Sequence, residues 1–189
     1  MLLTGAPSTD ARFRALFDAH HKSIHAYCLR RLPTEDANDA ASEVFLVAWR
    51  RSSDVPDSDE ALLWLYGVAR NVVRNRQRAG RRQVRLVART KSMAPEPKEG
   101  PETQVIRSEE HAEVLHAMES LSEAEQELLG HKVWEGLSNE AVGIILGISH
   151  RAVEGRYSRA LKKLTKQLER GHSATRRSPL SADKRETTT

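Results

Sequence analysis

Residues 136–164, with the sequence GLSNEAVGIILGISHRAVEGRYSRALKKL, carry the pattern of two helices joined by a tight turn. Ser138 and Ser149 stand where a hydroxyl side chain would cap the first and the second helix. Gly147 suits the left-handed conformation that often ends a helix, and Val153 falls on the side of the second helix that would be buried. This combination of cap, glycine and buried valine predicts a DNA-binding helix-turn-helix.

The second helix of this motif would present polar side chains to DNA. An arginine can bridge the acceptor atoms of guanine or hold a phosphate, and a serine can contact a base edge or the backbone. The outward side of this helix would carry His150, Arg151, Glu154, Ser158 and Lys162, with Arg156 and Arg159 flanking it. Glu154, beside them, could accept a hydrogen bond from cytosine or repel phosphate.

Two glycines lie inside the predicted helices, where each should cost about 1 kcal/mol relative to alanine. Gly143 falls where the two helices would cross, so a close approach of their backbones would account for it. Gly155 has no comparable explanation in the sequence.

The rest of the chain also shows helical periodicity. Apolar residues recur at helical spacing from Phe13 to about Arg31, a second helix follows with Thr34 as its N-cap, and a third begins near Glu60. No segment alternates polar and apolar residues over the length of a strand. The sequence therefore predicts an all-α fold.

Length and composition limit the class of protein. The chain has 189 residues, 39% of them hydrophobic, which suffices for one medium domain or two small ones. Its single cysteine, Cys28, excludes an internal disulfide and fits a reducing compartment. Neither a signal peptide nor an apolar run of about 18 residues is found. We therefore expect a cytoplasmic protein with no membrane insertion.

Charge is distributed unevenly along the chain. Residues 61–91 hold nine basic and no acidic side chains, and residues 150–189 hold eleven basic and four acidic ones. Between these blocks, residues 92–149 hold twelve acidic and three basic side chains. Two separate basic blocks predict two contacts with a polyanion such as nucleic acid, the alternative being two solvated helix faces.

A segment rich in proline divides the chain. Residues 92–104, SMAPEPKEGPETQ, contain three prolines among polar residues and cannot bury enough surface to fold. We expect two small helical domains, at residues 10–90 and 108–170, joined by a flexible linker at residues 91–107. Residues 171–189 are expected to form a disordered tail.

Three motifs connect the chain to a known family. EDANDAASEVFLVAWRR (35–51) is followed by WLYGVARNVVRNRQRAGRR (64–82), and the C-terminal half carries G-I-S-x-x-x-V-x-x-R-x-x-R-A at 147–160. In this order, over residues 10–170, they resemble the extracytoplasmic-function (ECF) sigma factors of the sigma-70 family. The resemblance implies that the first domain is a sigma region 2 helical bundle and the second a sigma region 4 helix-turn-helix domain.

The resemblance also implies a function. Such a protein would be a bacterial alternative sigma factor, which binds core RNA polymerase and directs promoter-specific initiation of transcription. Region 2 would read the melted −10 element and region 4 the duplex −35 element of promoter DNA. An anti-sigma factor is an expected further partner, whereas enzymatic activity, catalytic residues, cofactors and a metal site are not expected.

Individual residues receive roles from the same resemblance. The helix that starts near residue 34 would contact core polymerase through Asp39, Glu43, Phe45 and Trp49. The −10 strand would be held by polar side chains that recur every three or four residues on the third helix, namely Arg70, Asn71, Arg74, Asn75 and Arg78. The resemblance implies that the −35 element would be bound by Arg151, Arg156, Ser158 and Arg159.

Some positions depart from the family. Ser42 stands where relatives usually carry glutamine, and Glu154 and Gly155 stand where basic or hydroxyl residues are common. The loop SSDVPDSD, residues 52–59, matches the base-capture loop of the family in position but lacks the aromatic residue often found there.

Two other classes of protein compete with this interpretation. A transcriptional activator of the quorum-sensing or response-regulator type can end in a similar helix-turn-helix, but residues 1–90 lack the strand-helix alternation of a receiver domain. A metal or redox sensor could use His21, His25 and Cys28, which share one helix face, although no fourth ligand is evident. An enzyme is disfavoured, because no phosphate-binding loop, nucleophile elbow or paired metal motif occurs.

Overall fold

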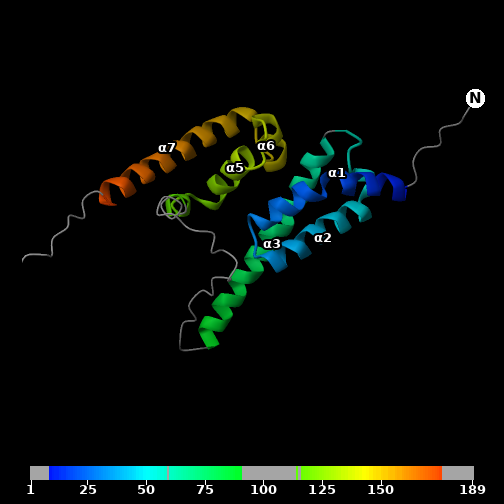
Figure 1. Cartoon of the computed structure of the whole chain (residues 1–189), viewed down its shortest axis with the longest axis horizontal. Coiled ribbons are helices and arrows are strands. Elements are labelled where there is room, and N and C mark those ends of the chain that lie inside the picture. Colours follow the sequence, from blue (N-terminus) through cyan, green and yellow to red (C-terminus); the bar gives the residue numbers. More distant parts are fainter. Residues whose placement is uncertain (1–8, 59, 91–113, 115, 176–189) are drawn as a thin grey trace, which may run out of the picture. The chain divides into compact units, whose positions relative to one another are not determined.

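The computed structural model describes residues 9–58, 60–90, 114 and 116–175, and these form two compact helical units (Figure 1). No strand occurs within those ranges, so the predicted all-α fold is confirmed. No helix in the described part is long and apolar enough to cross a membrane.

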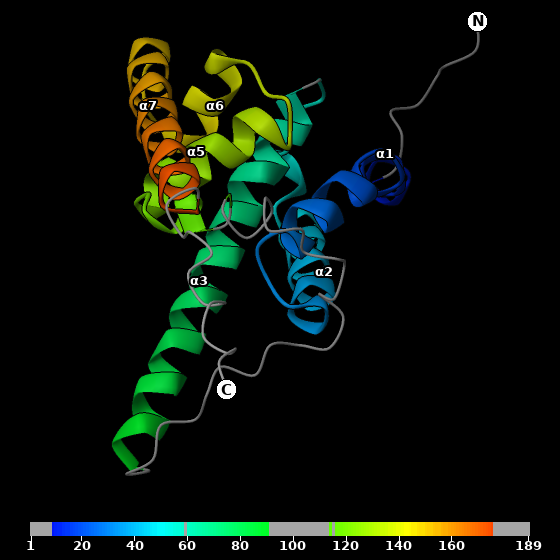
Figure 2. The same cartoon turned by 60° about the vertical axis from the view of Figure 1, so that its left-hand side comes forward.

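The first unit consists of three helices and one short turn. They are α1 (Thr9–Leu29), α2 (Thr34–Arg50), the 3-10 turn η1 (Ser52–Asp54) and α3 (Glu60–Thr90). Each of the three α-helices packs against the other two. The second half of α3 extends beyond α1 and α2, as both views show (Figures 1 and 2).

Small side chains on α2 make this packing possible. The inner face of α2 is almost completely buried and consists of Ala37, Ala40, Ala41, Val44 and Ala48. Alanine lets neighbouring helices approach closely, and larger side chains such as Tyr27 and Leu65, at 1% and 0% exposure, fill the remaining space. A larger residue on this stripe would overpack the core.

The start of α2 differs from the prediction. Thr34 is the first helical residue rather than the N-cap, which is Pro33, and no side chain caps this end of the helix. The Pro33 carbonyl accepts the first helical bond from the Ala37 N–H at 2.8 Å. Pro33 itself is not helical, since it has φ −55° and ψ 152°. The helix therefore begins at the next residue, without a capping hydroxyl.

The second unit is built from α5 (Glu123–Val133), α6 (Asn139–Leu146) and α7 (His150–Thr175), preceded by helical residues 116–119. Its core joins Leu121, Leu129 and Ala160, and partly buried residues such as Tyr157 and Leu164 pack around them. The Ser122 hydroxyl accepts from the Glu125 N–H while the Glu125 carboxylate accepts from the Ser122 N–H. This capping box sets the start of α5.

Two predicted segments need separate comment. The linker at residues 91–107 lies outside the described residues. The range predicted as a tail begins at residue 171, and α7 continues through Gly171 to Thr175. No proline interrupts the chain before Pro179, and one glycine reduces helix stability by only about 1 kcal/mol. Residues 176–189 lie outside the described part.

Candidate nucleic-acid interfaces

The turn between α6 and α7 has the geometry that the sequence predicts. Gly147 adopts φ +66°, in the left-handed region. The Ser138 hydroxyl accepts from the Ala141 N–H at 3.1 Å, and the Ser149 hydroxyl accepts from the Ala152 N–H at 3.2 Å. Both helices are therefore capped by the predicted serines.

Gly143 provides the close approach that this motif needs. A Cβ atom at this position would lie 2.7 Å from the carbonyl oxygen of Ile148 and 3.7 Å from the backbone nitrogen of His150. Real Cβ atoms essentially never approach backbone that closely, so only glycine fits where α6 lies against the turn that leads into α7. A close approach of backbones is confirmed, and it is to the turn at Ile148.

The first turns of α7 separate a buried face from a polar one. Val153 and Ala160 are fully buried against the second unit. The four side chains predicted to contact DNA, Arg151, Arg156, Ser158 and Arg159, are all exposed, as is Glu154. Arg151 and Ser158, two turns apart, lie on the same side of the helix.

Gly155 lies on the polar face of α7 and not in a packed contact. A Cβ atom there would meet only the guanidinium of Arg159, with Nη1 at 3.5 Å, which is an ordinary van der Waals distance. Packing within the described residues therefore does not require this glycine.

The basic part of α3 also presents one polar face. Asn71, Asn75 and Arg78 are exposed, and Arg70 and Arg74 are half-buried. The opposite side of the same turns is buried and includes Ala69, Val72 and Val73. The five predicted residues are thus brought together along the side of α3 that faces away from the core.

Arg76 is the exception in this basic block, because it points toward α2. Its Nη2 lies 2.9 Å from the Glu43 carboxylate, and its Nη1 lies 3.9 Å from Asp39 and 4.0 Å from Asp36. The Arg76 side chain is only 28% exposed, so this cluster is partly shielded from solvent. The sequence analysis did not identify Arg76, since its acidic partners lie more than 30 residues away.

The predicted polymerase-binding residues on α2 divide into two groups. Asp39, Glu43 and Trp49 are exposed, the last at 42%. Phe45 is 3% exposed, with its ring centroid 4.8 Å from that of Phe17, so it lies beneath this surface, and its role as a polymerase contact stays a prediction. Sequence periodicity alone did not show that α1 aromatic residues cover it.

Leu46 is a further exposed apolar residue on α2, at 47% exposure. It follows Glu43 by three positions and Asp39 by seven, which places all three on one helix face. This helical spacing was the signal in the sequence that could have identified Leu46 as part of the same face as the predicted polymerase-binding residues.

The residues suggested for a metal sensor do not form a common site. His25 Nε2 is hydrogen-bonded to Asn38 Oδ1 at 2.7 Å, and the His21 ring packs near Phe17 with centroids 4.6 Å apart. Cys28 is fully buried, and this burial raises its pKa to about 11. Within the described ranges, no group of three potential ligands could hold a metal ion.

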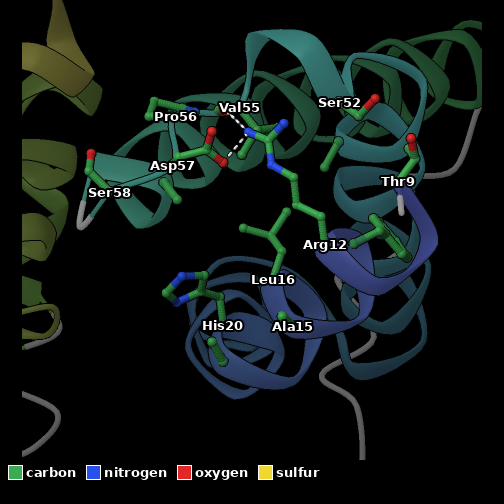
Figure 3. Close-up of a pocket in the computed structure, with 14 residues that line it drawn as sticks. Thr9, Arg12, Ala15, Leu16, His20, Ser52, Val55, Pro56, Asp57 and Ser58 are labelled. Atoms are coloured by element: carbon green, nitrogen blue, oxygen red, sulfur yellow. Dashed lines mark hydrogen bonds and ion pairs between the residues drawn. The ribbon is translucent and has the colours of Figure 1, made fainter. Parts of the chain in front are cut away.

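A cavity of about 250 Å³ lies between α1 and the loop at residues 52–58 (Figure 3). Its wall includes Leu16 and His20 from α1 and Pro56 from the loop. Burial lowers the pKa of His20. Arg12 reaches across from α1 to the loop, where its Nη2 donates to the Val55 carbonyl at 2.6 Å and pairs with Asp57 at 2.6 Å.

Comparison with known proteins assigns both units to one family. Residues 16–83 match the family model for sigma-70 region 2, and residues 111–164 match that for sigma-70, region 4. The RNA polymerase sigma factor NccH of Alcaligenes xylosoxydans xylosoxydans is 31% identical over 148 residues, covering 73% of this chain and 76% of that protein. The ECF sigma factor SigL of Mycobacterium tuberculosis is 26% identical over 165 residues, covering 86% and 92%.

A solved structure shares the fold. The sigma factor RpoE of Bartonella quintana, crystallised with the anti-sigma factor NepR, aligns with a TM-score of 0.61 at 18% identity, over 84% of this chain and 97% of that one. The helical bundle thus corresponds to sigma-70 region 2, and the helix-turn-helix lies in the part that matches sigma-70 region 4. This chain belongs to the ECF group of sigma-70 proteins. The alternative of a quorum-sensing or response-regulator activator is wrong, because the first unit matches sigma region 2.

Proposed function

We propose that this protein binds core RNA polymerase and directs it to promoters through two separate DNA contacts. α3 holds the melted −10 strand, and α7 reads the −35 element as duplex. The observation that carries the proposal is the pair of basic faces on exposed sides of two helices, one in each compact unit.

The −35 contact uses the first turns of α7. A capped helix that exposes its N-terminal half can enter the major groove, where Arg151 and Arg159 reach guanine acceptors or phosphates. Ser158 adds a short hydroxyl that can bind either a base edge or the backbone. Glu154, exposed among these residues, can accept a hydrogen bond from the amino group of cytosine.

The −10 contact uses the polar face of α3. Arg74 and Arg78 attract phosphates, and no acidic residue follows Glu60 on this helix to oppose them. Asn71 and Asn75 can hydrogen-bond the edges of unstacked bases. The loop at residues 52–58 corresponds in position to the base-capture loop of the family, and the cavity beside it offers an apolar wall.

The polymerase contact uses the exposed side of α2. Asp39 and Glu43 supply negative charge, while Leu46 and Trp49 supply apolar surface. This combination suits a protein partner with basic and apolar side chains. Phe45 supports this surface from beneath, with its ring centroid 6.5 Å from that of Phe13.

We also expect an anti-sigma protein as a regulatory partner, acting by covering these surfaces. The related fold of RpoE was solved together with such a factor. Because polymerase and promoters are its working partners, we expect the protein to act in the cytoplasm, without enzymatic activity of its own.

The decisive experiment is transcription in vitro with core polymerase and this protein, on promoters found by mapping transcript starts after overproduction. We expect initiation at sites that share a two-part upstream motif. A requirement for a second sigma factor would overturn the proposal.

Two substitutions separate the two DNA contacts. Arg151→Ala should weaken binding to the −35 duplex by about 1–3 kcal/mol and relax base preference there. Arg78→Ala should weaken binding to the −10 strand evenly across sequences, because it removes a phosphate contact. Arg14→Ala, exposed on α1, is the matched control. Equal losses at both elements from either substitution would contradict the assignment of the two faces.

A further inference from the structure

The loop between α2 and α3 is stiff in its middle. Val55 is 6% exposed and has φ −76° and ψ 121°. A residue that precedes proline is restricted to this extended region, so Pro56 reinforces the conformation that burial of Val55 also favours. The middle of the loop is therefore both anchored and extended.

Contacts within the loop fix its two ends. At the start, Arg51 Nε donates to Asp54 at 2.8 Å, and Arg51 Nη2 lies 2.6 Å from the same carboxylate oxygen. At the end, the Ser58 hydroxyl accepts from the Glu60 N–H at 3.3 Å. These contacts shape the loop locally but do not connect it to α1.

Arg12 makes the connection to α1. Its Nη2 bridges two acceptors, the carbonyl of Val55 and the carboxylate of Asp57, each at 2.6 Å (Figure 3). Hydrogen bonds with a charged donor are shorter and stronger than neutral ones. The two acceptors flank Pro56, which lines the cavity, so Arg12 fixes how far this wall stands from α1.

We propose that Arg12 is a positioning residue that determines which base the loop accepts in the −10 strand. This inference rests on the proposed function, since it assumes that the loop at residues 52–58 captures a base. Arg12 acts through the loop, because its Nη2 is held by the Val55 carbonyl and the Asp57 carboxylate, each at 2.6 Å.

The geometry predicts different effects for different substitutions. Arg12→Gln removes the charge and both short contacts. Asp57→Asn removes the ion pair but leaves the bond to the Val55 carbonyl, and its side chain is 81% exposed, so folding should be unaffected. Arg14→Gln changes an exposed arginine of the same helix and serves as the control.

The test uses holoenzyme and a pool of promoter templates randomised across the −10 element. The readout is the ratio of transcripts from the most and least favoured base at each position. Arg12→Gln should lower this ratio about tenfold at one or two adjacent positions, within the range that a single base contact supplies. Asp57→Asn should lower this ratio by less, and Arg14→Gln should leave it unchanged. The base preference at the −35 element should stay the same in all three variants.

The possible failures can be told apart. If the wild-type holoenzyme shows no −10 preference, the proposed function fails and this inference fails with it. If the wild type discriminates and Arg12→Gln keeps the same profile, or weakens all positions equally, only the role of Arg12 is overturned. Should Arg12→Gln not fold, as judged by circular dichroism, an unchanged profile in Asp57→Asn overturns it instead.

Discussion

Cys28 lies in the interior of the first unit, where its thiol has no exposed surface. Burial raises its pKa to about 11, although Arg31 and Arg76 act in the opposite direction. At pH 8 a thiol with this pKa is ionised in on the order of one molecule in a thousand. Only the thiolate reacts rapidly with disulfide reagents.

We therefore expect native Cys28 to react with a chromogenic disulfide reagent at least about a hundredfold more slowly than a small exposed thiol. The same protein in denaturant provides the control and should react at the rate of a free thiol. Equal rates in native and denatured protein would show that Cys28 is accessible.

Glu125 gives the second unit a defined response to acid. The backbone N–H of Ser122 and the ammonium of Lys163, at 3.0 Å, lower its pKa to about 2. A carboxylate with a depressed pKa stabilises the fold fully above its unfolded value near 4.5, and that contribution disappears as pH falls toward 2.

We expect Glu125→Gln to remove this part of the pH dependence and to lower stability at neutral pH by no more than about 1 kcal/mol, because glutamine still completes a capping box. Hydrogen exchange of residues 116–175 between pH 2 and 7 would measure both effects. Glu119→Gln, at an exposed position, is the control. An unchanged pH profile in Glu125→Gln would disprove the role of the carboxylate.

At the scale of elements, Gly143 in α6 and Gly155 in α7 should respond differently to substitution by alanine, because their surroundings differ. Gly143→Ala would place a Cβ 2.7 Å from the Ile148 carbonyl oxygen, which forces α6 away from the turn that follows it and should cost roughly 1–3 kcal/mol. Gly155→Ala meets only the end of a flexible arginine and should stabilise the protein by up to about 1 kcal/mol. Urea unfolding of both variants should show opposite signs, and a shared sign would refute this account.

The position of Gly155 suggests why a stabilising alanine is absent. It lies on the polar face of α7, one turn from both Arg151 and Arg159, where the missing side chain would let the backbone approach a base edge if this face binds DNA as proposed. We expect Gly155→Ala to weaken binding to the −35 duplex about tenfold while raising stability. Fluorescence anisotropy of holoenzyme on duplex DNA would measure this. Unchanged binding would mean that the glycine is not required for recognition.

Local features of the elements could be predicted from the sequence, because their partners are near in the chain. Ser138, Gly147 and Ser149 act within one helical turn, and all three have the predicted roles. The surroundings of Phe45 and Arg76 could not be predicted, because the groups that contact them come from other helices. Periodicity identifies which face of a helix is apolar, but not which neighbour covers it.

The tie between Arg12 and the loop shows the same limit over a longer separation. Arg12 and Val55 are 43 residues apart, and neither position carries a pattern that would pair them. The site residues on α3 and α7 were predicted as sets, since each set occupies one helix face. Their roles in binding DNA remain predictions.

For the whole molecule, the two DNA-binding faces lie in separate compact units. Substitutions that share no partner contribute independently to a free energy. The double variant Arg78→Ala with Arg151→Ala should therefore weaken promoter binding by the sum of the single effects, within about 0.5 kcal/mol. Titration of holoenzyme on one promoter would give all four values, and a larger deviation would reveal coupling between the units.

Arg76 has a consequence for how the free protein and the holoenzyme differ. It belongs to the helix proposed to hold the DNA strand, yet its charge is engaged by Asp36, Asp39 and Glu43 on the surface proposed for polymerase. A polymerase cation that drew Glu43 away would release positive charge beside the strand. Thermodynamic linkage is reciprocal, so DNA would then tighten polymerase binding by the same factor, and the protein without polymerase would bind promoters more weakly by that factor.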